Sequence, residues 1–121
     1  MDAETDLFVQ AFWVKCRETI RPALDDARDR LRDAGHDAEI ATLEFSSDQQ
    51  AAPDAAPALV LSVHRSGEVG TWVLRYRGDV PTREVEISLP GERPVRADMS
   101  RIDDAMVKNH IAAAFGGLIK S

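Results

Sequence analysis

The sequence predicts an α+β fold with two layers. A four-stranded antiparallel meander sheet is packed by a long N-terminal helix and a C-terminal helix, in the order α-β-β-β-β-α. Three observations support this prediction. Apolar residues recur at steps of three and four over residues 5–34, apolar and polar residues alternate over 58–89, and a second helical stripe covers 100–118. The two helical stripes are the apolar surfaces available to cover the apolar face of the sheet.

The first helix is predicted over residues 5–34 and is expected to end at Gly35. Pro22 lacks an amide hydrogen, so we expect a kink or a break near residues 18–22. The face predicted to pack on the sheet carries Val9, Trp13, Cys16, Ile20, Leu24, Ala27, Leu31 and Ala34.

Two hairpins are predicted from turn residues and from side-chain parity. Centring the first hairpin on Gly67-Glu68 gives one apolar face to the pairs Val63–Trp72, Leu61–Leu74 and Leu59–Tyr76. Centring the second on Val80-Pro81 gives the apolar pairs Tyr76–Val85, Leu74–Ile87 and Trp72–Leu89, with Arg77–Glu84 and Arg75–Glu86 as direct neighbours on the outer face.

The remaining segments are assigned from weaker patterns. A further strand is expected over Ala38–Phe45, with Ala41, Leu43 and Phe45 facing inward. Residues 90–99 are expected to form an irregular connection. Ser100 is then expected to cap the last helix, with Asp103 in a capping-box position. The apolar stripe of that helix contains Ile102, Met106, Val107, His110, Ile111, Ala114 and Leu118.

Length and composition limit the organisation of the chain. Its 121 residues are predicted to form one α+β domain, 1–121, with a mobile loop at about 46–57. A single cysteine, Cys16, excludes an internal disulfide framework and a multi-cysteine zinc site. Twelve of the fifteen basic residues are Arg, which is typical of a GC-rich bacterial genome.

Charge and hydropathy argue against two classes of partner. The net charge of −6 repels a phosphate backbone, so we expect no nucleic acid partner. The apolar run Leu7 to Val14 is far too short for a bilayer span, so we expect no membrane partner and a cytoplasmic protein.

No motif for catalysis or cofactor binding is found in the sequence. Phosphate-binding glycine motifs are absent, and Cys16 lies on an apolar stripe, where we expect it to be buried and inert. His36, His64 and His110 lack the ligand spacing that is typical of zinc sites. We therefore expect no catalytic residue, no cofactor and no metal, and the sequence favours a non-enzyme without deciding the question.

The N-terminal segment points to a protein partner. It is apolar nearly all round, and Leu7, Phe8, Phe12 and Val14 are predicted to lie off the sheet-facing line as an interface. A homodimer is the commonest way to cover such a patch. The first functional hypothesis is therefore a small non-catalytic interaction protein that self-associates, as an adaptor, a chaperone-like protein or an accessory subunit.

Two other hypotheses stay open. One is a small-ligand binder with an apolar pocket between helix and sheet, lined by Trp13, Trp72, Leu74, Tyr76 and His110. The other is an enzyme with a dispersed site. In size, charge and mix of elements the chain resembles chaperones of type III secretion systems. It departs from them because no helix interrupts the predicted sheet, and no motif matches, so membership of that family is not inferred.

Overall fold

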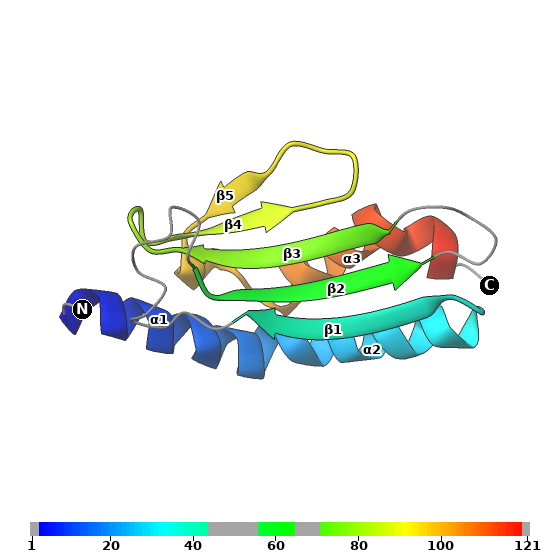
Figure 1. Cartoon of the computed structure of the whole chain (residues 1–121), viewed down its shortest axis with the longest axis horizontal. Coiled ribbons are helices and arrows are strands. Elements are labelled where there is room, and N and C mark those ends of the chain that lie inside the picture. The colour runs from blue at the N-terminus through cyan, green and yellow to red at the C-terminus, as the bar shows by residue number, and fades with distance from the viewer. Residues whose placement is uncertain (1–2, 44–55, 65–70, 120–121) are drawn as a thin grey trace.

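The computed structural model describes residues 3–43, 56–64 and 71–119. The expected loop at 46–57 lies almost wholly outside the described residues. The helical segments are α1 (Ala3–Lys15), a π-helical turn (Cys16–Ile20), α2 (Arg21–Asp33), a 3-10 turn (Met99–Arg101) and α3 (Asp104–Ile119). The strands are β1 (Asp37–Leu43), β2 (Ala58–His64), β3 (Trp72–Asp79), β4 (Glu84–Ser88) and β5 (Val95–Ala97) (Figure 1).

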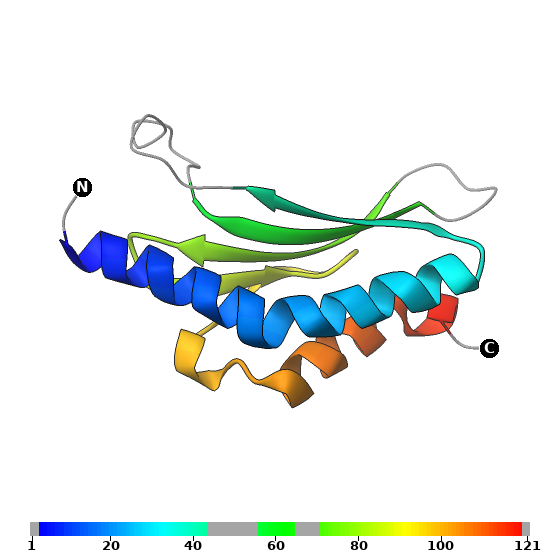
Figure 2. The same cartoon turned by 90° about the horizontal axis from the view of Figure 1, so that it is seen from below.

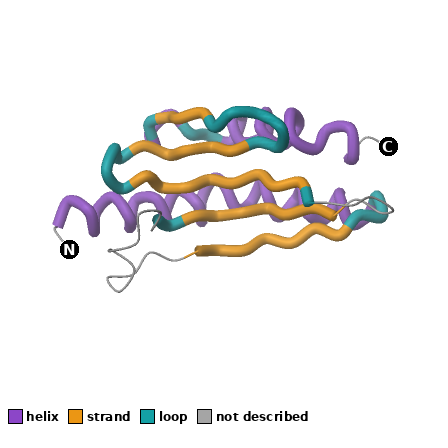
Figure 3. Tube along the Cα trace, turned by 45° about the horizontal axis from the view of Figure 1, so that its top comes forward, coloured by secondary structure: helices purple, strands orange, loops and turns teal. Residues whose placement is uncertain are grey.

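The architecture is the two-layer α+β fold that the sequence predicts. The strands form one antiparallel sheet in the order β1-β2-β3-β4-β5 (Figure 3). All described helices lie against one face of this sheet, and no described element covers the other face (Figure 2). Among the described residues, no helix combines the length and the apolar character that a bilayer span requires.

The number of strands differs from the prediction, because the connection 90–99 contains the fifth strand. β5 is only three residues long and pairs Arg96 with Glu86. Its two apolar residues flank an arginine, and this pattern is too short to distinguish a strand from a loop. Periodicity alone therefore does not reveal β5.

The β2–β3 hairpin has the predicted register. Leu61 lies opposite Leu74, and Leu59 lies opposite Tyr76, all four buried on the helix-facing side.

The prediction of which β1 side chains face the helices is wrong. Ala38 is opposite Val63 and is buried, so the odd-numbered residues of β1 face outward and Leu43 is 54% exposed. Of the three residues expected inward, Ala41 and Leu43 therefore face outward, and Phe45 lies outside the described residues.

The β3–β4 register is shifted by two residues from the prediction. Tyr76 lies opposite Ile87 rather than Val85, because a four-residue turn joins the strands instead of a two-residue one. Arg83 closes this turn with φ of 62°, and its amide donates to the Asp79 carbonyl. The five predicted direct pairs are therefore wrong, although a two-residue shift keeps every side chain on its predicted face.

The first helix contains a π-helical turn where the sequence predicts a kink or break. The Arg21 amide donates to the Cys16 carbonyl, five residues back, directly before Pro22. One extra residue in this turn rotates α1 relative to α2. The core-facing residues of α1 are consequently Phe8 and Phe12, whereas Trp13, predicted to face the sheet, is only partly buried.

Helix ends follow local capping chemistry. Gly35, with φ of 91°, ends the first helix as predicted, and the His36 amide donates to the Leu31 carbonyl in the arrangement of a helix stop. Ser100 does not cap the last helix. Asp103 does so by accepting a hydrogen bond from the Met106 amide at 2.8 Å.

The core joins the two layers over most of the length of the sheet. Tyr76, Phe12 and Phe115 are its largest fully buried side chains. Gly78 passes so close to α1 that a Cβ atom there would lie 3.2 Å from the Phe12 ring and 3.1 Å from Pro57. A glycine at this point of β3 therefore lets the aromatic ring of α1 reach the sheet.

Candidate functional site

The outer side of α1 carries a short apolar stripe. Leu7 is 65% exposed and Val14 is 40% exposed, and Ala11 between them is also exposed. Steps of four and three residues place these side chains on one side of a helix. Leu7, Ala11 and Val14 together form the α1 outer stripe.

A shallow groove adjoins the Val14 end of the α1 outer stripe. It has a volume of about 560 Å³ and lies between this helix and the 3-10 turn. The Lys15 ammonium donates to the Ile102 carbonyl at 2.9 Å and so ties the helix to the segment after that turn. The lining residues are Ala11, Val14, Lys15, Glu18, Thr19, Asp98, Met99 and Ser100.

Charged side chains of opposite sign stand at the two ends of α1. Glu4 and Asp6 lie near its start, and Lys15 lies in its last turn, followed by Arg17. Glu4 pairs with Arg83 at 3.7 Å. Within the described part of the chain, Asp6 and Arg17 form no hydrogen bond or ion pair, and both residues are exposed.

Two of the four predicted interface residues belong to the core. Phe8 is 8% exposed, and Phe12 is fully buried and packs edge-on against Trp13 with ring centroids 5.2 Å apart. The expectation that both point away from the sheet is wrong, because the π-helical turn changes the phase of the helix. Leu7 and Val14 remain on the surface, as expected.

The five residues proposed to line a ligand pocket are partly core residues. Leu74 and Tyr76 are fully buried, and Trp13 and Trp72 pack against the core while staying partly exposed. The Tyr76 hydroxyl shares a hydrogen bond of 2.8 Å with His110 Nδ1. Burial raises the pKa of Tyr76 and lowers the pKa of His110, and both shifts favour the neutral forms of the two side chains. None of the five lines the groove beside Val14, the groove between α2 and α3 or the groove at the end of the sheet.

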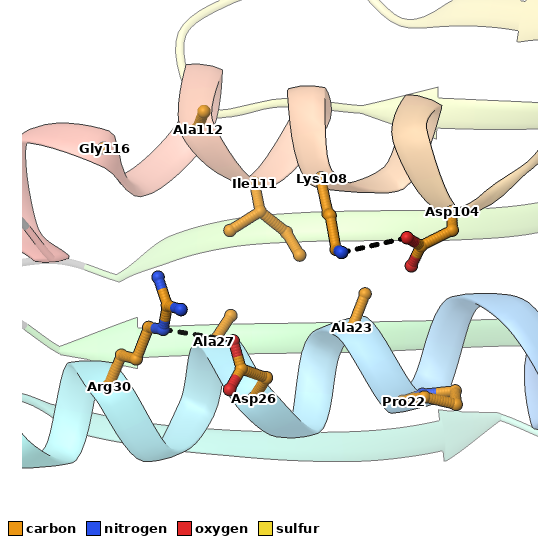
Figure 4. Close-up of a pocket in the computed structure, with 10 residues that line it drawn as sticks. All are labelled: Pro22, Ala23, Asp26, Ala27, Arg30, Asp104, Lys108, Ile111, Ala112 and Gly116. Atoms are coloured by element: carbon orange, nitrogen blue, oxygen red, sulfur yellow. Dashed lines mark ion pairs between the residues drawn. The ribbon is translucent and has the colours of Figure 1, made fainter.

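The groove between α2 and α3 has a volume of about 670 Å³ (Figure 4). Apolar side chains such as Ala27 and Ile111 lie within it. Each wall carries its own ion pair: Asp26 with Arg30 at 3.1 Å on α2, and Asp104 with Lys108 at 2.9 Å on α3. The charges along this groove are therefore neutralised in pairs.

The groove at the end of the sheet, of about 510 Å³, lies where β1 and β2 meet the residue that precedes β3. His64 is hydrogen-bonded to the Thr71 hydroxyl at 3.0 Å and lies opposite Asp37. The described residues contain no group of three or more His, Cys, Asp or Glu side chains placed to hold a metal ion.

Cys16 is buried, as the sequence predicts. It is 3% exposed, and burial raises the pKa of its thiol to about 12. A thiol is a nucleophile only as the thiolate, which is scarce at neutral pH under these conditions. Cys16 therefore has the environment of a core side chain.

An ion-pair cluster lies on the outer face of the sheet, and the sequence pattern indicated its Arg75 and Glu86 but not its Asp79 and Arg96. Arg96 of β5 forms an ion pair with the nearly buried Asp79, and it also pairs with Glu86 at 3.5 Å. Burial opposes ionisation of Asp79, but hydrogen bonds from Arg96 and Thr82 hold the pKa of its carboxyl below its usual range. Arg75 reaches Glu86 diagonally at 3.6 Å. The cluster fastens the last two strands to β3.

Fold and surface together define a two-layer α+β protein with an exposed apolar stripe on its first helix. No known protein family, curated protein or solved structure matches this chain. Its function must therefore be inferred from the described residues themselves.

Proposed function

We propose that this chain is a cytoplasmic, non-catalytic interaction protein that self-associates through the α1 outer stripe, as an adaptor, chaperone-like protein or accessory subunit. The observation that carries the proposal is the 65% exposure of Leu7 on the same side of α1 as Val14. Covering both side chains removes apolar area from water, at roughly 25 cal/mol per Å².

Three side chains that acid–base or nucleophilic chemistry could use make structural contacts instead. Cys16 is buried with a raised pKa, and His110 is hydrogen-bonded to a core tyrosine. Glu86 is paired with arginine side chains. These contacts support a binding role over a catalytic one.

The size of the stripe sets the expected strength of association. A helix of 13 residues is about 20 Å long, so we expect two copies of α1 to bury an area at the low end of specific interfaces. Such interfaces are typical of transient complexes. We therefore expect a dissociation constant in the micromolar range rather than an obligate dimer.

Self-association is tested by sedimentation equilibrium between about 1 and 500 µM, using the wild type and the double variant Leu7→Glu/Val14→Glu. The wild type is expected to shift from monomer to dimer mass over this range. The variant is expected to remain monomeric, because each glutamate would be desolvated at the interface. Val95→Glu is the matched control, since Val95 is 49% exposed and lies outside α1.

Circular dichroism and thermal unfolding verify that each variant is folded before its mass is compared. A wild type that stays monomeric at about 500 µM would contradict self-association. A Leu7→Glu/Val14→Glu variant that dimerises as the wild type does would contradict the assignment of the interface to α1.

A further inference from the structure

The outer side of α1 has an exposed apolar side chain near one end and a groove near the other. Leu7 projects at one end, and the groove beside Val14 and Met99 opens at the other. Seven residues, or about 10 Å of helix, separate Leu7 from Val14. A surface that carries both parts can pair with a copy of itself, since a two-fold interface requires self-complementarity.

We infer that two copies of this chain associate with their α1 helices antiparallel, about a two-fold axis near Gln10 and Ala11. The inference rests on the proposed self-association and adds its geometry. The axis places Leu7 of each copy over Val14 of the other, at the mouth of the groove that contains Met99. Each leucine then enters the recess of the opposite copy.

Charge provides independent support for the antiparallel direction. Asp6 and Arg17 are eleven residues apart, which is about three helical turns, so they lie on the same flank of the helix. In an antiparallel pair about a two-fold axis, the same flank of both helices lies on the same side of the interface, and the two helices run in opposite directions. Asp6 of each copy therefore meets Arg17 of the other, which gives two ion pairs in one dimer. A parallel pair would place like charges together.

The opposite flank of α1 is already occupied by contacts within the chain. Glu4 pairs with Arg83 at 3.7 Å, and the Lys15 ammonium donates to the Ile102 carbonyl at 2.9 Å. In the part of the chain that the structure describes, Asp6 and Arg17 lack such partners. These two side chains are therefore available to select the orientation of the second copy.

The inference is tested by reversing the charges of Asp6 and Arg17 in the full chain. The dimer dissociation constant of each variant is measured by sedimentation at low salt. Asp6→Arg alone and Arg17→Asp alone are each expected to weaken dimerisation about tenfold, because two attractive pairs become two repulsive ones. The double variant Asp6→Arg/Arg17→Asp is expected to recover the wild-type constant to within about twofold. Arg93→Asp changes the net charge as Arg17→Asp does and is the control for that variant.

The outcomes separate this inference from the proposed function. If either single variant dimerises as the wild type does, or if the double variant shows no recovery, the antiparallel arrangement is wrong. Self-association through α1 still holds in that case, provided that Leu7→Glu/Val14→Glu abolishes the dimer. A monomeric wild type overturns both.

Discussion

Replacing Phe12 by alanine is expected to lower the free energy of unfolding by about 3–5 kcal/mol. The Phe12 ring is fully buried and closes the gap between α1 and Gly78 of the sheet. Truncation removes the ring and leaves a cavity that a well-packed core fills only in part. Urea denaturation, with the slope of the transition compared between proteins, measures the loss.

Leu7→Ala is the matched control on the same helix. It removes an apolar side chain that is 65% exposed, so in the monomer the change is expected to stay within about 0.5 kcal/mol. A loss of stability at Leu7 as large as the loss at Phe12 would contradict the phase of α1 in the structure, in which Phe12 is buried and Leu7 is exposed.

Replacing Gly78 by valine is expected to cost about 1–3 kcal/mol, although valine favours strands. The added side chain would begin 3.2 Å from the Phe12 ring and 3.1 Å from Pro57, and its branches need further room. Because the cause is a contact with Phe12, the double variant Phe12→Ala/Gly78→Val is expected to lose less stability than the sum of the two single variants.

Gly117→Ala is the control for Gly78→Val, because it replaces a glycine that has open space around it. Apart from its chain neighbours and the adjoining backbone of α3, no described residue has an atom within 4 Å of a Cβ placed at Gly117, which is exposed. Alanine is expected to stabilise this helix by about 0.5–1 kcal/mol. A destabilisation at Gly117 would contradict its open surroundings on α3, whereas additive losses at Phe12 and Gly78 would show that the two layers do not pack through the Phe12–Gly78 contact.

The parts of the fold that depend on side-chain parity could be predicted from the sequence. Alternation places Leu61 and Leu74 on one buried face and finds the β2–β3 register, because its turn residues suit a short hairpin. The same argument fails between β3 and β4. Two registers that differ by two residues bury the same side chains. The alternation of apolar and polar residues therefore cannot distinguish a two-residue turn from a four-residue turn.

The exposed residues of α1 were predictable only in part, for a different physical reason. Periodicity of 3.6 residues assumes one continuous helix, whereas the π-helical turn before Pro22 adds a residue and rotates α1. The rotation puts Phe8 and Phe12 on the core face in place of Val9 and Trp13. Leu7 and Val14 keep their predicted exposure, since both lie away from the packed side in either phase.

The grooves could not be predicted from the sequence. Each is lined by residues far apart in the chain, such as Val14 with Met99 or Ala27 with Ile111. Their proximity depends on how the helices and the 3-10 turn pack against one another. Neither composition nor motif spacing contains that information.

The most direct test of self-association through α1 is disulfide trapping between chains that carry Leu7→Cys and chains that carry Val14→Cys. The native Cys16 does not compete, because it is buried and its thiol pKa is raised to about 12. After the two proteins are mixed and oxidised at about 100 µM, mass spectrometry of the linked peptides is expected to show chiefly the link from position 7 of one chain to position 14 of the other. Linkage no faster than for a Val95→Cys control, with no preference among pairs, would contradict the account.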